Sequence, residues 1–249
     1  MPFVVAGHPA PASLGTLLRT LEAAGADAVE VGIPFSDPIA DGPVIAAAMH
    51  RSLSSGVTVE AVLQQMRAAR PTVDIPVLAM ASVSIVDRLG GPSFLDTLHE
   101  SGFDGLILPD ADLDAVGPMS ERAERLDMAF TSLIAPDTPM PRVERIASHA
   151  REFIYILARR GLTGARKDAP EIATRVAELR QVTNLPLVAG FGISTTEHVQ
   201  AVLSHAQGAI VGSALVAALD AQTDDPSIQE VVERLLVPMA AAISGTAPR

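Results

Sequence analysis

Cysteine is absent from the sequence, and lysine is nearly absent. Without cysteine the chain forms no disulfide and offers neither a thiolate nucleophile nor a thiolate ligand for a metal ion. Lys167 is the only lysine. It falls in a predicted long loop rather than at the end of a strand, where a Schiff-base lysine would have to lie, so imine chemistry is disfavoured.

Positive charge and long apolar runs are also scarce. The formal net charge is −11 and the pI is near 4.9, which argues against binding to nucleic acid or to an anionic membrane, because basic patches supply most of that affinity. No run of about 18 uncharged apolar residues occurs, and the start MPFVVAGHP lacks the basic region of a signal peptide. We therefore expect a cytoplasmic protein that binds a small molecule or an ordinary protein partner.

The six histidines show no metal-binding spacing such as HxH or HExxH. This pattern disfavours a zinc-dependent aldolase and predicts no metal site. His8 follows the end of a predicted strand and is the one histidine within reach of a site there, but we expect it to be a solvated loop residue.

Short apolar runs alternate with longer amphipathic stretches along the whole chain. Such runs are typical of strands that are covered on both faces, as in parallel sheets. Stretches such as 13–26, 92–103 and 171–184 carry apolar residues at helical spacing. The predicted strands are 3–6, 28–32, 76–80, 105–109, 129–135, 153–158, 186–190 and 208–212.

About eight βα units in one chain predict an α/β fold, a (β/α)8 barrel that forms a single domain over residues 1–249. The competing architecture is an open doubly wound sheet. That fold usually carries a GxGxxG turn after its first strand, whereas the first strand here ends in AGHPAP. The last residues, SGTAPR, are the only stretch that we expect to be disordered.

Glu30 lies inside the apolar run AVEVG, where an ionised carboxylate is costly unless something compensates it. Alternation places Val29 and Val31 toward the helices and Glu30 inside the barrel. One interpretation is an interior glutamate held by a salt bridge or by water. The other is a general acid and base at the carboxyl end of a strand, with a pKa raised by desolvation.

Two more acids follow in the proline-stiffened loop IPFSDPIADGP. Asp37 precedes Pro38 and Asp41 precedes Gly42, so each alone is typical of a turn residue. The nearness of Glu30 changes this interpretation for Asp41, because acid and base roles require two carboxylates in different surroundings. We expect Asp37 to shape the turn or meet a partner.

Three glycine-containing turns follow the last three predicted strands: RRGLTGAR at 159–166, GFGIS at 190–194 and VGSAL at 211–215. Each alone is consistent with a simple tight turn. Together they occupy the place where barrels often hold phosphate, and glycines let backbone N–H groups approach an anion. The sequence therefore predicts a phosphorylated substrate, with the candidate binding residues Gly164, Gly190, Gly192, Gly212 and Ser213.

Several motifs resemble the tryptophan synthase alpha chain family, in that family's order and over almost the whole chain. They are PFVVAGHP, AGADAVEVGIPFSDPIADGPVI, SGFDGLILPD, YILARRGLTGAR, PLVAGFGIS and GAIVGSAL. The longest of them is highly specific. The resemblance implies a lyase of tryptophan biosynthesis that cleaves indole-3-glycerol phosphate to indole and glyceraldehyde 3-phosphate by a retro-aldol reaction.

The resemblance also implies residue roles. Glu30 is the general acid and base that protonates indole C3, and Asp41 accepts the indole N–H. Thr163 orders a lid that excludes water, and Tyr155 and Phe3 line the pocket. The chain itself needs no cofactor. Pyridoxal phosphate is expected only in a beta subunit, the partner in an alpha2beta2-type complex.

The chain departs from the family at a few positions. A helix usually precedes the first strand, but here it is shortened or absent. Val83 and Ser84 stand where a Tyr and an Asn are common, and Ala46 replaces a usual Gln. These positions affect the identity of the substrate and the strength of beta association. Two alternatives therefore stay open: a stand-alone or divergent lyase for another indole phosphate, or a mainly regulatory partner of a beta-like subunit.

Overall fold

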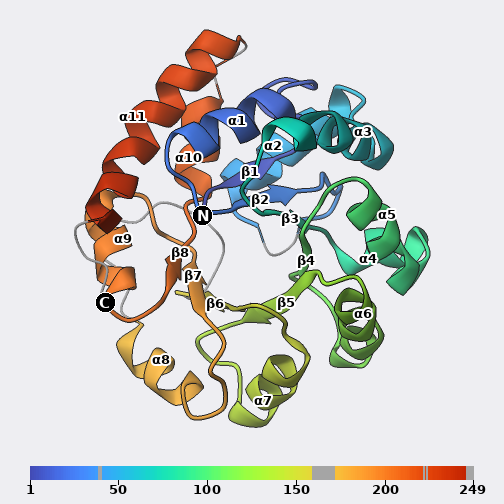
Figure 1. The fold of residues 1–249 in the computed structure, drawn as a ribbon, viewed down its shortest axis with the longest axis vertical. Helices are drawn as coiled ribbons and strands as arrows, with labels where there is room; N and C mark the ends of the chain where they lie inside the picture. Colours follow the sequence, from blue (N-terminus) through green and yellow to red (C-terminus); the bar gives the residue numbers. More distant parts are fainter. Residues whose placement is uncertain (39–40, 159–171, 221, 223, 245–249) are drawn as a thin grey trace.

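The computed structural model describes residues 1–38, 41–158, 172–220, 222 and 224–244. Eight parallel strands form one curled sheet in which each strand pairs with its neighbours in sequence. A parallel bridge between Pro2 and Val211 joins the first and last strands. The predicted barrel is therefore confirmed (Figure 1). The strands are β1 (Phe3–Val5), β2 (Val29–Gly32), β3 (Val77–Met80), β4 (Gly105–Leu108), β5 (Ala129–Ile134), β6 (Ile154–Leu157), β7 (Leu187–Gly190) and β8 (Gly208–Ala209).

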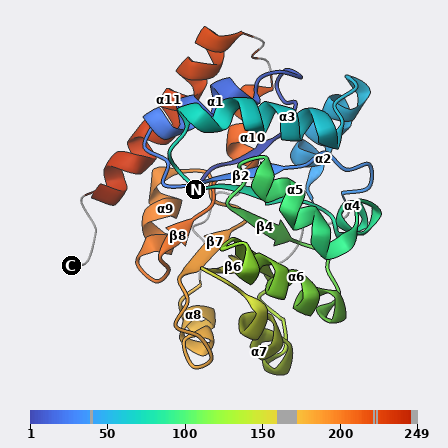
Figure 2. The same ribbon diagram turned by 45° about the vertical axis from the view of Figure 1, so that its right-hand side comes forward.

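Helices surround the strands in both ribbon views (Figures 1 and 2). Their bounds are α1 (Leu14–Ala23), α2 (Pro43–Ser54), α3 (Val59–Ala69), α4 (Val83–Arg88), α5 (Phe94–Glu100), α6 (Leu113–Arg125), α7 (Met140–His149), α8 (Ala173–Leu179), α9 (Thr196–Leu203), α10 (Ser213–Leu219) and α11 (Asp225–Ser244). None of the described helices is both long and apolar enough to cross a membrane.

The strands are buried on both faces, which explains their continuous apolar sequences. In β2, Val29 and Val31 belong to the apolar layer between strands and helices, as the alternation predicts. The helices complete that layer with one face each, and α1 does so with leucines at helical spacing. A second apolar cluster fills the inside of the barrel and includes Phe3, Val5, Leu78, Met80, Ile107, Tyr155 and Ile210.

The acidic loop after β2 ends where α2 begins. Gly42 is the N-cap of α2 in an extended conformation, and Pro43 takes the first helical position, where its missing N–H costs nothing. The amide of Asp41 donates to the carbonyl of Pro38 at 3.0 Å. Asp41 is therefore fixed between a turn and a helix start.

Three expectations about the chain differ in detail from the structure. The last strand ends at Ala209 rather than at residue 212, because the backbone then turns through the Val211 bridge into α10. His8 is buried, not solvated, because α10 packs against β1 and covers it. At the carboxyl end, α11 includes Ser244, and residues 245–249 lie outside the described residues.

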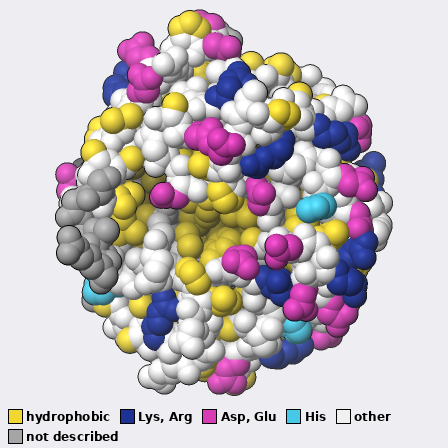
Figure 3. All heavy atoms as spheres, in the orientation of Figure 1, with side chains coloured by type: hydrophobic (Ala, Val, Ile, Leu, Met, Phe, Trp, Pro, Cys, Tyr) yellow, Lys and Arg dark blue, Asp and Glu magenta, His cyan; other side chains and the backbone are white. Residues whose placement is uncertain are grey.

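An apolar hollow opens at the N-terminal end of the barrel, where the strands begin. It encloses about 770 Å³ of empty space, part of which is open solvent. Its lining includes Met1, Leu78, Phe153 and Val188, together with the acids Asp104, Asp127 and Glu152. Figure 3 shows apolar side chains gathered in a hollow at the centre of one face, with Asp and Glu side chains around it.

Candidate active site

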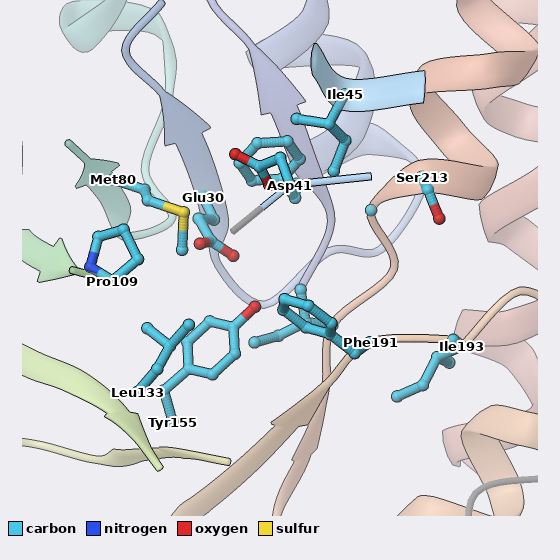
Figure 4. A pocket seen from close by; sticks show the side chains of 14 residues that line it. Glu30, Asp41, Ile45, Met80, Pro109, Leu133, Tyr155, Phe191, Ile193 and Ser213 are labelled. Atoms are coloured by element: carbon cyan, nitrogen blue, oxygen red, sulfur yellow. The ribbon is translucent and has the colours of Figure 1, made fainter. Parts of the chain in front are cut away.

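A cavity lies at the opposite end of the barrel, where the strands end. It has about 540 Å³ of empty space and is partly open to solvent. Its position is the one at which barrel enzymes build their active sites. Its lining residues are Phe3, Glu30, Asp41, Ile45, Met80, Pro109, Leu133, Tyr155, Phe191, Gly192, Ile193, Ile210, Gly212 and Ser213 (Figure 4).

Glu30 is completely buried in the wall of this cavity. Strand pairing places it between Phe3 and Leu78, so its neighbours on both sides are apolar. Neither carboxylate oxygen has a hydrogen-bond partner among the described residues. Burial, followed by the nearby charge of Asp41, raises the pKa of Glu30 to about 8. A proton therefore resides on Glu30 at neutral pH, and the described residues provide no salt bridge for it.

Asp41 enters the same cavity from the loop after β2. Its side chain and that of Glu30 point into one space in Figure 4. Burial raises the pKa of Asp41 to about 6. The two carboxylates thus differ in protonation at neutral pH, which is the arrangement that separate acid and base roles require. Asp37 is exposed and lies beside a neighbouring hollow, not in this cavity.

Tyr155 and Phe3, two further predicted residues, also line the cavity. The tyrosine is buried, and burial together with the charges of Glu30 and Asp41 raises its pKa well above 10. Gly190 makes room for it, because a Cβ there would lie 2.6 Å from the tyrosine hydroxyl. Gly190 itself is absent from the cavity lining, so its visible role is packing.

The predicted glycine turns meet on one side of the cavity. Gly192, Gly212 and Ser213 all line it, and α10 begins at Ser213. Phe191 and Gly192 both have positive φ, at 77° and 80°. Neither Lys nor Arg occurs among the described lining residues, so an anion here would depend on backbone N–H groups and the serine hydroxyl. Thr163 and Gly164 lie outside the described residues.

The apolar wall of the cavity was not predicted. Met80, Pro109 and Leu133 stand at or near the ends of successive strands, and Figure 4 shows them on the side away from Ser213. The available signal was their place at the ends of predicted strands. The positions that depart from the family pattern, namely Val83, Ser84 and Ala46, do not line this cavity.

The cavity therefore has an apolar end, a glycine-rich end and two carboxylates. The described residues contain no group of three or more His, Asp or Glu placed to hold a metal ion. A long substrate with a flat apolar group and an anionic group fits this polarity. The two carboxylates lie between these ends, and their pKa values of about 8 and about 6 are suited to proton transfer near neutral pH.

Known proteins of one family are similar to this chain over nearly its whole length. The family model described as tryptophan synthase alpha chain matches residues 1–243. The tryptophan synthase alpha chain of Geobacillus stearothermophilus is 38% identical over 240 residues, which cover 96% of this chain and 86% of that protein.

Solved structures show the same similarity. The crystal structure of tryptophan synthase subunit alpha from Legionella pneumophila is 32% identical, with a TM-score of 0.86 over 98% of this chain and 92% of that one. A mutant alpha-subunit from Pyrococcus furiosus is 28% identical, with a TM-score of 0.87 over 96% of each chain. The protein belongs to the tryptophan synthase alpha chain family.

Proposed function

We propose that this protein is the lyase of tryptophan biosynthesis that cleaves indole-3-glycerol phosphate to indole and glyceraldehyde 3-phosphate. The observation that carries this proposal is Glu30, a fully buried carboxyl group in the cavity wall with no hydrogen-bond partner among the described residues. Such a group destabilises the fold, and groups of this kind cluster at functional sites, so a reaction that needs it explains its presence. Membership in a family of lyases supports the same conclusion.

Glu30 carries the proton. With a pKa of about 8 it is protonated at neutral pH and donates its proton to indole C3. The carboxylate that remains accepts the proton of the glycerol hydroxyl next to the ring. The electrons of that O–H bond form the aldehyde, the bond from carbon to C3 breaks, and its electron pair returns to the indole ring. One residue thus acts first as acid and then as base.

Asp41 stabilises the positive charge on the indole ring that forms between protonation of C3 and loss of the hydroxyl proton. Protonation at C3 places positive charge on the indole nitrogen, and an ionised Asp41 accepts the N–H hydrogen bond. Its pKa of about 6 keeps most of it ionised at neutral pH. The two roles require opposite protonation states, and the two pKa values provide them.

The two ends of the cavity fit the two ends of the substrate. The wall of Met80, Pro109 and Leu133 receives the indole ring. Gly192, Gly212 and Ser213 bind the phosphate through backbone N–H groups and the hydroxyl. Phe3 and Tyr155 enclose the middle of the substrate. Thr163 is assigned to the lid by the family resemblance alone, and Gly164 is assigned to the phosphate site by its glycine-containing turn in the sequence alone.

We also assign a partner and a setting by family membership. The protein acts in the cytoplasm, needs no cofactor of its own and associates with a beta subunit that binds pyridoxal phosphate. A related solved structure is that of tryptophan synthase from M. tuberculosis in an aminoacrylate-bound form. The apolar wall of this cavity retains indole until it passes to the partner.

Indole release by the purified protein tests this function. Indole-3-glycerol phosphate is supplied with and without a beta subunit, and indole and glyceraldehyde 3-phosphate are both measured. We expect indole and glyceraldehyde 3-phosphate to be released in equal amounts, and at a higher rate when the beta subunit is present. Equal rates in both conditions would indicate a stand-alone lyase. No indole release under either condition would contradict the lyase assignment. If this protein then still speeds up the beta subunit's own reaction, it is a regulatory partner.

A further inference from the structure

His8 is buried between β1 and α10, although nothing in the proposed reaction uses it. Only 3% of its surface is exposed. Its ring Nε2 lies 3.1 Å from the carbonyl oxygen of Val216, in a contact that is itself buried. A carbonyl can only accept, so Nε2 carries the hydrogen. This fixes the tautomer of the ring in its neutral form, and the bond persists when the ring is protonated.

The carbonyl that His8 contacts lies in the last turn of α10. There the amide of Asp220 bonds to Ala217 at 3.3 Å, so the helix ends in a tightened turn. Carbonyls in the last turn of a helix lack the usual intrahelical donors and need other partners. His8 supplies a donor that is 208 positions away in sequence.

The other end of α10 is also attached to β1. Just before the helix, Val211 accepts from the amide of Phe3 at 2.9 Å and donates to Met1 at 3.1 Å. In the sequence, Gly212 and Ser213 lie between Val211, which makes these bonds, and Val216, which His8 contacts. Both Gly212 and Ser213 line the cavity. Phe3 also packs beside Gly212 at ordinary van der Waals distance, because a Cβ there would lie 3.5 Å from the Cβ of Phe3.

The backbone of His8 is itself held firmly. Its amide donates to Val5 at 3.0 Å. Gly7, the residue before it, has φ of 83°, and a Cβ at that position would lie 2.6 Å from Val57. The imidazole therefore projects from a fixed turn and contacts the last turn of α10.

We propose that His8 is a positioning residue, which holds α10 in place through Val216 and so fixes the Gly212–Ser213 wall of the substrate cavity. This inference rests on the proposed function, in which that wall binds the phosphate of the substrate. His8 does not touch the substrate. Its loss therefore weakens phosphate binding and leaves proton transfer by Glu30 in place.

Three substitutions of His8 separate the hydrogen bond from the volume of the side chain. His8→Leu keeps a side chain of similar volume and removes the hydrogen-bond donor. His8→Gln places an amide N–H near the position of Nε2, whereas His8→Asn is too short to reach Val216. The matched control is Ser101→Ala, because the buried Ser101 donates to a helical carbonyl, that of Thr97 in α5, at 2.6 Å, and neither residue lines the cavity.

The measurements are the KM and kcat for indole release and the Kd of inorganic phosphate by calorimetry. We expect His8→Leu and His8→Asn to raise both KM and Kd about ten-fold with kcat within about two-fold. His8→Gln stays near the wild type, and Ser101→Ala changes neither constant. Similar Kd values for His8→Gln and His8→Asn would overturn the inference. If His8→Leu does not fold, the comparison of these two variants still tests the role of the hydrogen bond.

The phosphate measurement is independent of catalysis. If the wild type releases no indole but binds phosphate, the lyase assignment fails while the His8 inference is still decided by the Kd values. If the wild type releases indole and the His8 variants keep its KM and Kd, only the His8 inference fails. Absence of phosphate binding in the wild type overturns it as well.

Discussion

The two ends of the barrel both combine acidic side chains with an apolar hollow, but the acids differ in exposure and in hydrogen-bond partners. At the N-terminal end, Asp104 is half exposed, pairs with Arg70 at 2.9 Å and accepts from the amide of Val77 at 2.7 Å. At the C-terminal end, Glu30 is fully buried without a partner among the described residues. The first acid is compensated and the second is not.

This difference separates stability from function. A carboxylate with an arginine, a backbone donor and water around it stabilises the folded state modestly. A carboxylate with none of these lowers stability whenever it ionises. Substitution at the two ends is therefore expected to have opposite effects on folding and on activity.

The largest effect is expected for Glu30→Gln, which should lower kcat by about 10² to 10⁴, because it removes the proton carrier. The variant should still bind inorganic phosphate with a Kd close to that of the wild type, since the glycine-rich end is untouched. Steady-state indole release and calorimetry measure the two quantities. Turnover within ten-fold of the wild type would refute the assignment of Glu30.

The same substitution should stabilise the fold. The pKa of Glu30 rises from 4.5 to about 8 on folding, so the folded state binds a proton that the unfolded state loses. Stability of the wild type therefore falls as pH rises from about 4.5 to 8, by on the order of 3 kcal/mol at pH 7. Urea unfolding at pH 5 and pH 8 should show the gain of Glu30→Gln growing with pH. An equal gain at both values would contradict the raised pKa.

Asp41→Asn should lower kcat by about 10² to 10³, because a neutral amide stabilises the indole cation less well. In the wild type, kcat/KM should fall below about pH 6 as Asp41 is protonated and above about pH 8 as Glu30 ionises. The acidic limb should vanish in the variant. A limb that persists unchanged would assign it to another group.

At the opposite end, Asp104→Ala should lower the free energy of unfolding by about 1 to 2 kcal/mol, because Arg70 and the amide of Val77 both lose an acceptor. Its kcat and KM should match the wild type. Arg70→Ala removes the ion pair together with the hydrogen bonds from Arg70 to the carbonyls of Ile75 and Gly102, so it should cost a similar amount. A large loss of activity in Asp104→Ala would show that the two ends are coupled.

The sequence predicts the acids better than the surfaces around them. Glu30 is conspicuous because alternation places a costly group inside a barrel. Met80 and Leu133 are ordinary apolar strand residues, and they become a cavity wall only when strand pairing brings their ends together. His8 was expected in solvent because its cover, α10, comes from the far end of the chain. Local pattern does not reveal such distant contacts.

Backbone strain offers the finest comparison between the ends. Glu152 at the N-terminal hollow has φ of 71°, and Phe191 at the cavity has φ of 77°. Both are uncommon for residues with a side chain, and strain of this kind gathers at functional sites. The two positions therefore test whether the strain serves a function at one end and not at the other.

Glu152→Gly should raise the free energy of unfolding by about 0.5 to 1 kcal/mol, since relief of the left-handed strain exceeds the entropy that glycine adds to the unfolded chain. Its KM should not change, because the exposed Glu152 lies far from the substrate. Phe191→Gly relieves the same strain but removes part of the cavity wall, so it should raise KM about ten-fold. Thermal unfolding and steady-state kinetics of both variants decide this. If Phe191→Gly keeps the wild-type KM, the strain at Phe191 is as incidental to function as that at Glu152.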